Sequence, residues 1–80
     1  MRLISQNGEI DVPYEIASLS RTGNIIRAYV PIVGEKGTVM ACYSTDEKAK
    51  KVMEMLHRAY HDAVTHDNVS AFRFPKDDEV

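Results

Sequence analysis

The pattern of apolar and polar residues divides the chain into a strand-forming part and a helical part. Up to about residue 43, apolar side chains alternate with polar ones in short runs, which is the period of a half-buried β-strand. Over residues 45–66 they recur every third or fourth position, which is the period of an amphipathic helix. A last alternating run, 69–74, predicts one more strand. These patterns together predict an α+β protein.

The sharpest local signal is the start of the helix. Ser44 followed by Glu47 forms an S-x-x-E capping box, in which each side chain satisfies a backbone N–H that helix geometry leaves free. The buried stripe of the helix is expected to consist of Ala49, Val52, Met53, Leu56, Ala59, Tyr60, Ala63 and Val64. A single helix of this kind has one natural partner, which is the face of a sheet.

Turn signals separate the predicted strands. Asn7-Gly8, between two short alternating runs, predicts a type I′ hairpin turn. Two more turns are expected at residues 21–24 and 34–37. The sequence therefore predicts a two-layer sandwich, with a mainly antiparallel sheet of about five to six short strands and one long helix, over about 45–66, on one face.

Length and cysteine content narrow the class of protein. A chain of 80 residues is expected to form one domain over 1–80, with a short acidic tail at 76–80. A domain of this size has a thin core, so a homo-oligomer that buries more surface is expected. The single cysteine, Cys42, fits a reducing cytoplasm. No apolar stretch approaches the roughly 20 residues of a membrane span, so no membrane partner is expected.

The charge distribution disfavours a nucleic-acid partner. The segment 67–80 carries two more acidic than basic side chains, and this excess accounts for the whole net charge of −2. A protein that binds a nucleic-acid backbone usually has a concentrated basic face. The sequence shows no such concentration of lysine and arginine.

Strand parity identifies the sheet face that the helix leaves uncovered. Alternate residues of the run at 25–32 are expected to face the core: Ile26, Ala28, Val30 and Ile32. Arg27 and Tyr29 then point to the opposite face, and Arg73 of the last strand is expected to join them. This face has three possible roles: a half-solvated surface, a self-association surface, or a ligand-binding surface. In the third role Arg27 and Arg73 hold a phosphate and Tyr29 stacks on a base.

Catalytic and metal sites find little support in the sequence. His57 and His61 lie one helical turn apart, as in the zinc motif H-E-x-x-H, but Arg58 occupies the position of its general base. Glu54 could join the two histidines as metal ligands. A polar margin beside the buried stripe is the simpler interpretation. We therefore expect no enzyme, no metal site and no cofactor.

Four segments of the chain resemble known proteins. They are MRLISQNG at 1–8, DVPYE at 11–15, YST at 43–45 and FRFPKDDE at 72–79. These segments are similar to a group of small, largely uncharacterised proteins encoded by phages and prophages of gut Firmicutes. The resemblance implies a phage-infected bacterial cytoplasm as the setting, and it transfers no activity and no functional residues.

This setting favours a non-enzymatic anti-defence binding protein. The first hypothesis is an oligomeric sponge that sequesters a nucleotide-derived immune signal, such as a cyclic ADP-ribose-like molecule or a cyclic dinucleotide. The second is an inhibitor of a host defence complex, as anti-CRISPR proteins are, or a small phage accessory or assembly protein. In the second hypothesis the acidic tail or the uncovered sheet face binds a host protein.

Overall fold

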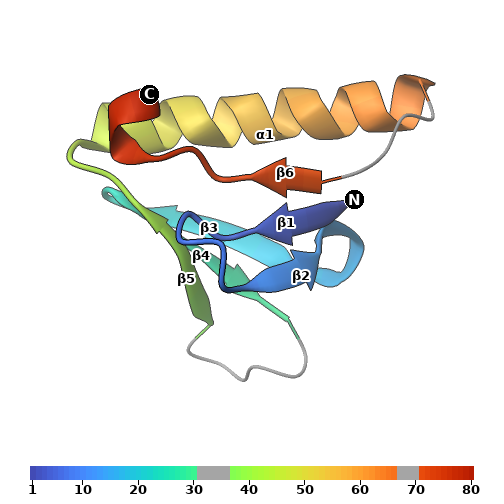
Figure 1. Cartoon of the computed structure of the whole chain (residues 1–80), viewed down its shortest axis with the longest axis horizontal. Coiled ribbons are helices and arrows are strands. Elements are labelled where there is room, and N and C mark those ends of the chain that lie inside the picture. Colours follow the sequence, from blue (N-terminus) through green and yellow to red (C-terminus); the bar gives the residue numbers. More distant parts are fainter. Residues whose placement is uncertain (31–36, 67–70) are drawn as a thin grey trace.

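A computed structural model of the chain describes residues 1–30, 37–66 and 71–80 (Figure 1). The described part contains six short strands, one long helix and two short 3-10 turns. In chain order they are β1 (Arg2–Ile4), β2 (Asp11–Pro13), η1 (Tyr14–Ile16), β3 (Ser18–Thr22), β4 (Ile25–Tyr29), β5 (Thr38–Cys42), α1 (Asp46–His66), β6 (Ala71–Arg73) and η2 (Asp77–Glu79). The α+β class, the position of the long helix and the number of strands agree with the sequence prediction.

In the described part of the chain the strands form two sheets of three, not one sheet. The first sheet has the order β2-β1-β6, in which β1 is antiparallel to β2 and parallel to β6. The second has the order β3-β4-β5 and is antiparallel throughout. The prediction of a single five- to six-stranded sheet is therefore wrong. The alternation of side chains determines which face of a strand is buried, but it does not determine which strands pair.

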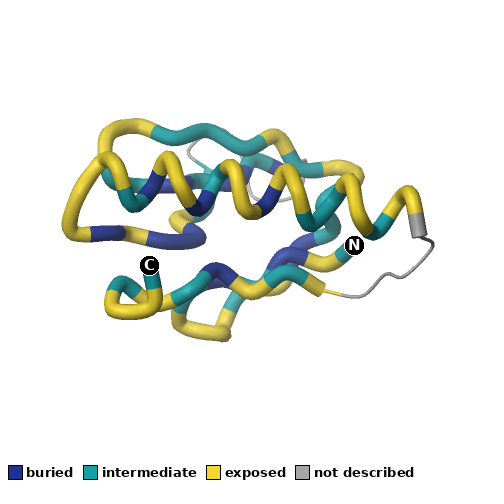
Figure 2. Tube along the Cα trace, turned by 90° about the horizontal axis from the view of Figure 1, so that it is seen from above, coloured by how far each residue is buried: buried dark blue, intermediate teal, exposed yellow. Residues whose placement is uncertain are grey.

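One hydrophobic core lies between the helix and both sheets. It contains Leu3 and Val12 of the first sheet, Ile26 of the second, and Phe74 after β6. Buried positions recur from turn to turn along α1 (Figure 2), and its fully buried side chains are Ala49, Val52 and Leu56. These three confirm most of the predicted stripe at the start of the helix.

The far end of α1 departs from the predicted stripe. Val64 is 64% exposed, although its position in the period predicts burial. In Figure 1 the last turns of α1 extend beyond the start of β6, so no described strand of the first sheet lies below them. The spacing of apolar residues identifies the face of a helix that is suited to burial. The length of the neighbouring strands decides how much of that face is covered.

The predicted core face of the run at 25–32 is confirmed for the residues that the structure describes. Ile26, Ala28 and Val30 are 0%, 1% and 5% exposed. Ile32 and most of the predicted turn at 34–37 lie outside the described residues.

The hairpin predicted at Asn7-Gly8 forms, but its turn lies one residue earlier. The N–H of Gly8 donates to the carbonyl of Ser5 at 2.9 Å, so Gln6 and Asn7 are the central residues of the turn. Gly8 follows with a positive φ of 78°. The side chain of Asn7 explains the longer loop, because its Oδ1 accepts hydrogen bonds from Ser5 Oγ and from the N–H of Glu9.

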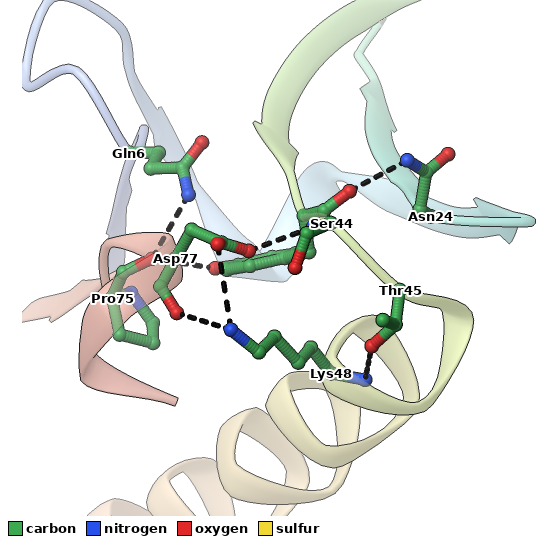
Figure 3. A network of polar contacts seen from close by, with 8 residues as sticks. Gln6, Asn24, Ser44, Thr45, Lys48, Pro75 and Asp77 are labelled. Atoms are coloured by element: carbon green, nitrogen blue, oxygen red, sulfur yellow. Dashed lines mark hydrogen bonds and ion pairs between the residues drawn. The ribbon is translucent and has the colours of Figure 1, made fainter.

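The N-cap of α1 is Thr45, not Ser44. Oγ1 of Thr45 accepts a hydrogen bond from the N–H of Lys48 at 3.2 Å, which is the N3 position of the helix (Figure 3). Ser44 instead donates its backbone N–H to the carboxylate of Asp77 at 2.7 Å. The predicted capping box of Ser44 and Glu47 is therefore wrong by one residue, because a carboxylate from the end of the chain binds Ser44.

Polar contacts hold the acidic segment 76–80 against the start of α1. Nζ of Lys48 donates to the carbonyl of Asp77 at 2.9 Å and lies 3.4 Å from Oδ2 of the same residue. The hydroxyl of Tyr43 donates to the carbonyl of Pro75 at 2.7 Å. Burial raises the pKa of the Tyr43 phenol, and the charges of Asp77 and Glu79 add to this effect, so it stays protonated as a donor.

The hydrogen bond from the N–H of Ser44 lowers the pKa of the Asp77 carboxyl, and Lys48 contributes to the same shift. A carboxylate whose folded-state pKa is lowered adds stability above its ordinary pKa of 3.8, and this stability is lost as the pH falls through the folded value. Asp77→Asn is therefore expected to lower the melting temperature at neutral pH and to make its decline in acid shallower. Thermal unfolding followed by circular dichroism from about pH 7 to about pH 2 measures both effects.

Asp78→Asn is the matched control, because Asp78 is the neighbouring carboxyl and is exposed. It is expected to leave the melting temperature and its acid profile close to those of the wild-type protein. Identical acid profiles for Asp77→Asn and the wild-type protein would contradict the stabilising role of Asp77.

Candidate functional site

A groove of about 410 Å³ lies between α1 and the segment that runs from η1 into β3. Its lining consists of Tyr14, Glu15, Ala17, Leu19, Met53, His57 and Tyr60. The three helical members are spaced by four and three residues, which places them on one flank of α1. Small-molecule sites commonly have volumes of roughly 300–1,000 Å³ and an apolar lining with a few polar groups. The volume of the groove lies within this range, and its exposed lining is more polar than apolar.

Two stacked tyrosines form the aromatic wall of the groove. The ring centroids of Tyr14 and Tyr60 are 4.3 Å apart, and the ring planes are inclined by 27°. Tyr14 comes from η1 and Tyr60 from α1, so the stack joins the 3-10 turn to the helix. Within the described residues neither phenol hydroxyl has a hydrogen-bond partner. A phenol hydroxyl can both donate and accept, so either one can hydrogen-bond a ligand in the groove.

A carboxylate and an imidazole supply the remaining polar groups of the groove. The Glu15 carboxylate accepts a hydrogen bond from the α-amino group of Met1 at 2.5 Å. This contact lowers the pKa of the Glu15 carboxyl, which is therefore ionised at neutral pH. His57 is exposed along the helical flank and can donate or accept a hydrogen bond. Leu19 and Met53 form the apolar part of the lining.

The histidines of α1 do not assemble a metal site in the described structure. Across residues 1–30, 37–66 and 71–80, no three His, Cys, Asp or Glu side chains form a group that could hold a metal ion. His57 lines the groove, whereas Glu54 and His61 are exposed on the helix.

The structure separates the three predicted ligand-binding residues between its two sheets. Arg27 and Tyr29 lie two positions apart on β4 and share the face opposite its buried residues. Arg73 lies on β6, in the other sheet. A Cβ added at Gly8 would lie 3.4 Å from Nη2 of Arg73, so this guanidinium sits beside the β1–β2 turn. None of the three residues lines the groove.

Arg27 and Tyr29 remain together on the outer face of the second sheet. Arg27 is half-buried and pairs with Ser20 of β3 and Val39 of β5. The ring of Tyr29 covers Gly37, where an added Cβ would lie only 2.6 Å from its Cε1. Part of the Tyr29 ring is therefore used for packing. The rest of this face keeps its three predicted alternatives, as a half-solvated surface, a self-association surface or a ligand-binding surface.

The groove itself is not predicted from the sequence. The helical period places Met53 and Tyr60 in the buried stripe and His57 beside it, which identifies one wall. The opposite wall depends on η1, where Tyr14 follows the strand-ending Pro13. Three residues of 3-10 turn produce no period that a sequence pattern can reveal.

No helix in the described residues is both long enough and apolar enough to cross a membrane. Comparison of the chain with protein-family models, with curated proteins and with solved structures found no match. The chemistry of the groove lining is therefore the main indication of function.

The Tyr14–Tyr60 stack is expected to contribute about 0.5–1.5 kcal/mol beyond the area that it buries. A double-mutant cycle with Tyr14→Leu and Tyr60→Leu, measured by urea unfolding, should return a coupling of that size. Pairing Tyr29→Leu with Tyr60→Leu provides the control, because Tyr29 lies on the outer sheet face and its substitution should be additive. Additive effects for Tyr14 and Tyr60 would show that the stack contributes no energy of its own.

Proposed function

We propose that the chain is a non-enzymatic binding protein that sequesters a small nucleotide-derived molecule in the groove. The observation that carries the proposal is the lining itself. Two stacked tyrosines, three apolar side chains, a carboxylate and an imidazole surround a volume of about 410 Å³. The volume lies within the range of small-molecule sites, and the polar groups can orient a polar ligand.

Each chemical part of a nucleotide has a matching group in the groove. The tyrosine rings offer a flat apolar surface for a base, and stacking on an aromatic side chain is worth about 1–3 kcal/mol per base. The Glu15 carboxylate can accept hydrogen bonds from ribose hydroxyls or from base N–H groups. His57 and the phenol hydroxyls of Tyr14 and Tyr60 can donate to phosphate oxygens.

The phage-protein resemblance supplies the biological setting. In an infected bacterial cytoplasm, cyclic ADP-ribose-like molecules and cyclic dinucleotides act as immune signals. A protein that removes such a signal needs affinity and no bond-making step. Stacking surface and polar contacts are sufficient for this task.

A different observation favours a second candidate, an inhibitor that docks on a host defence protein. Ile16 and Val64 are large apolar side chains that are 56% and 64% exposed. Ile16 lies between two groove residues in the sequence, and Val64 lies one helical turn beyond Tyr60. Large apolar side chains gathered on one surface are typical of protein-binding sites.

Isothermal titration calorimetry against cyclic ADP-ribose isomers, ADP-ribose and cyclic dinucleotides tests the proposal. At least one of these ligands is expected to bind the wild-type protein. Tyr60→Leu should weaken that binding about ten-fold or more, since it removes one stacking ring. Arg27→Ala is the matched variant on the other surface and should leave the affinity unchanged.

The opposite result, with Arg27→Ala weakening the affinity and Tyr60→Leu not, would move the site to the outer face of β4. No binding of any ligand at high protein concentration would refute the proposal. If Ile16→Asp then abolished capture of a specific host protein, the second candidate would be favoured.

A further inference from the structure

The outer edge of β3 has no partner strand in the described part of the chain. β3 stands at the end of the order β3-β4-β5. Natural proteins usually protect such an edge with proline, charged side chains or a bulge. The strand sequence SLSRT contains no proline, its one charged side chain is Arg21, and its ladder with β4 is regular. The irregularity of this sheet lies on the other side, between β4 and β5.

The short turn between β3 and β4 determines which backbone groups of this edge are free. Thr22 pairs with Ile25 across a two-residue turn, and such a closing pair exchanges both of its hydrogen bonds. Every second residue before Thr22 therefore also bonds to β4. The residues between them are Leu19 and Arg21, and their N–H and C=O groups point away from β4.

We propose that a second copy of this chain pairs with β3 in antiparallel orientation, with the two-fold axis at Ser20. Leu19 of each copy then faces Arg21 of the other. Each of these two pairs exchanges two hydrogen bonds, which uses every free edge group of the two residues in both copies. On the outer face Ser20 meets Ser20 and Ser18 meets Thr22, and hydroxyl pairs of this kind form favourable cross-strand contacts.

Charge and existing hydrogen bonds select this register over its neighbours. A shift toward the C-terminal end of β3 would place Arg21 opposite Arg21, and like charges directly opposite are destabilising. A shift toward the other end would bring Ala17 into the ladder. The N–H of Ala17 already donates to the carbonyl of Tyr14 at 3.2 Å. The only charged residue of β3 therefore faces an uncharged one in the proposed register.

The pairing also changes the groove, and this consequence rests on the proposed function. Leu19 and Arg21 lie on the core side of the sheet, since they pair with the buried Ala28 and Ile26 of β4. Arg21 of the second copy would therefore lie beside Leu19, which lines the groove. The lining of one chain contains a single basic side chain, His57. Nη1 of Arg21 donates to the carbonyl of Gly23 at 2.7 Å, and the other N–H groups of this guanidinium would add a phosphate-binding group at the rim.

Sedimentation velocity combined with lysine substitutions tests the pairing. The wild-type chain is expected to sediment as a dimer, at twice its mass of 9.0 kDa. Ser20→Lys should return it to 9.0 kDa, because two lysines would face each other across the axis with Cα atoms about 4.5 Å apart. An equal mixture of Ser20→Lys and Ser20→Glu should restore the dimer. Ser18→Lys is the matched control and should remain dimeric, since its lysine faces Thr22.

Cysteine cross-linking provides a second measurement of the register. In a Cys42→Ser background, which removes the exposed native thiol, Ser20→Cys should form an intermolecular disulfide under mild oxidation. Ser18→Cys should not, because the two copies of residue 18 would be roughly 13 Å apart. A monomeric wild-type chain would overturn the proposal, and so would a dimer that Ser20→Lys does not dissociate or equal cross-linking at both positions. Circular dichroism confirms that each variant is folded.

Arg21→Gln tests the consequence for the groove separately. It is expected to keep the dimer and to weaken the binding of ADP-ribose about ten-fold. An intact dimer that binds ADP-ribose equally well with and without Arg21, or a wild-type dimer that does not bind ADP-ribose, would refute the role of Arg21 and leave the pairing in place. A monomeric wild-type chain that still binds ADP-ribose would refute the pairing and leave the proposed function in place.

Discussion

The two sheets are joined at Gln6, and the positions of the other elements depend on this residue. Its backbone N–H donates to the carbonyl of Met40 at 2.7 Å, and its Oε1 accepts from the N–H of Cys42 at 3.1 Å. Its Nε2 donates to the carbonyl of Pro75 at 3.2 Å. Backbone groups at the edge of a sheet need partners when they are removed from water. Gln6 supplies these partners to β5, and the same side chain holds the segment that follows β6.

This joint allows one helix to cover two sheets. Once β5 and the C-terminal segment are held together, Thr45 and Asp77 set the start of α1, and its buried face reaches both sheets (Figures 1 and 3). The flank of α1 then meets η1 and forms the groove. The groove and the free edge of β3 are neighbours, because Leu19 belongs to both. The proposed ligand-binding groove and the proposed pairing edge thus lie on the same side of the molecule.

The sequence predicted the features that depend on neighbouring residues. The amphipathic period located α1, whose bounds at Asp46–His66 lie within one residue of the prediction. Parity along β4 identified its core face. The errors arose where a distant group competed with a local one. Asp77 binds Ser44, so the helix cap moved to Thr45, and Asn7 binds two groups of its own loop, so the turn moved to Gln6 and Asn7.

The sequence by itself determined the fold class, the long helix and the buried face of β4, because these follow from periods of two and 3.6 residues within a single segment. Only the tertiary structure decided that the strands form two sheets, that Arg73 is separated from Arg27 and Tyr29, and that Tyr14 stacks on Tyr60. These features depend on contacts between segments that are far apart in the chain. The energy of such contacts comes from packing and from satisfied backbone groups, and a local pattern of residues does not encode either one.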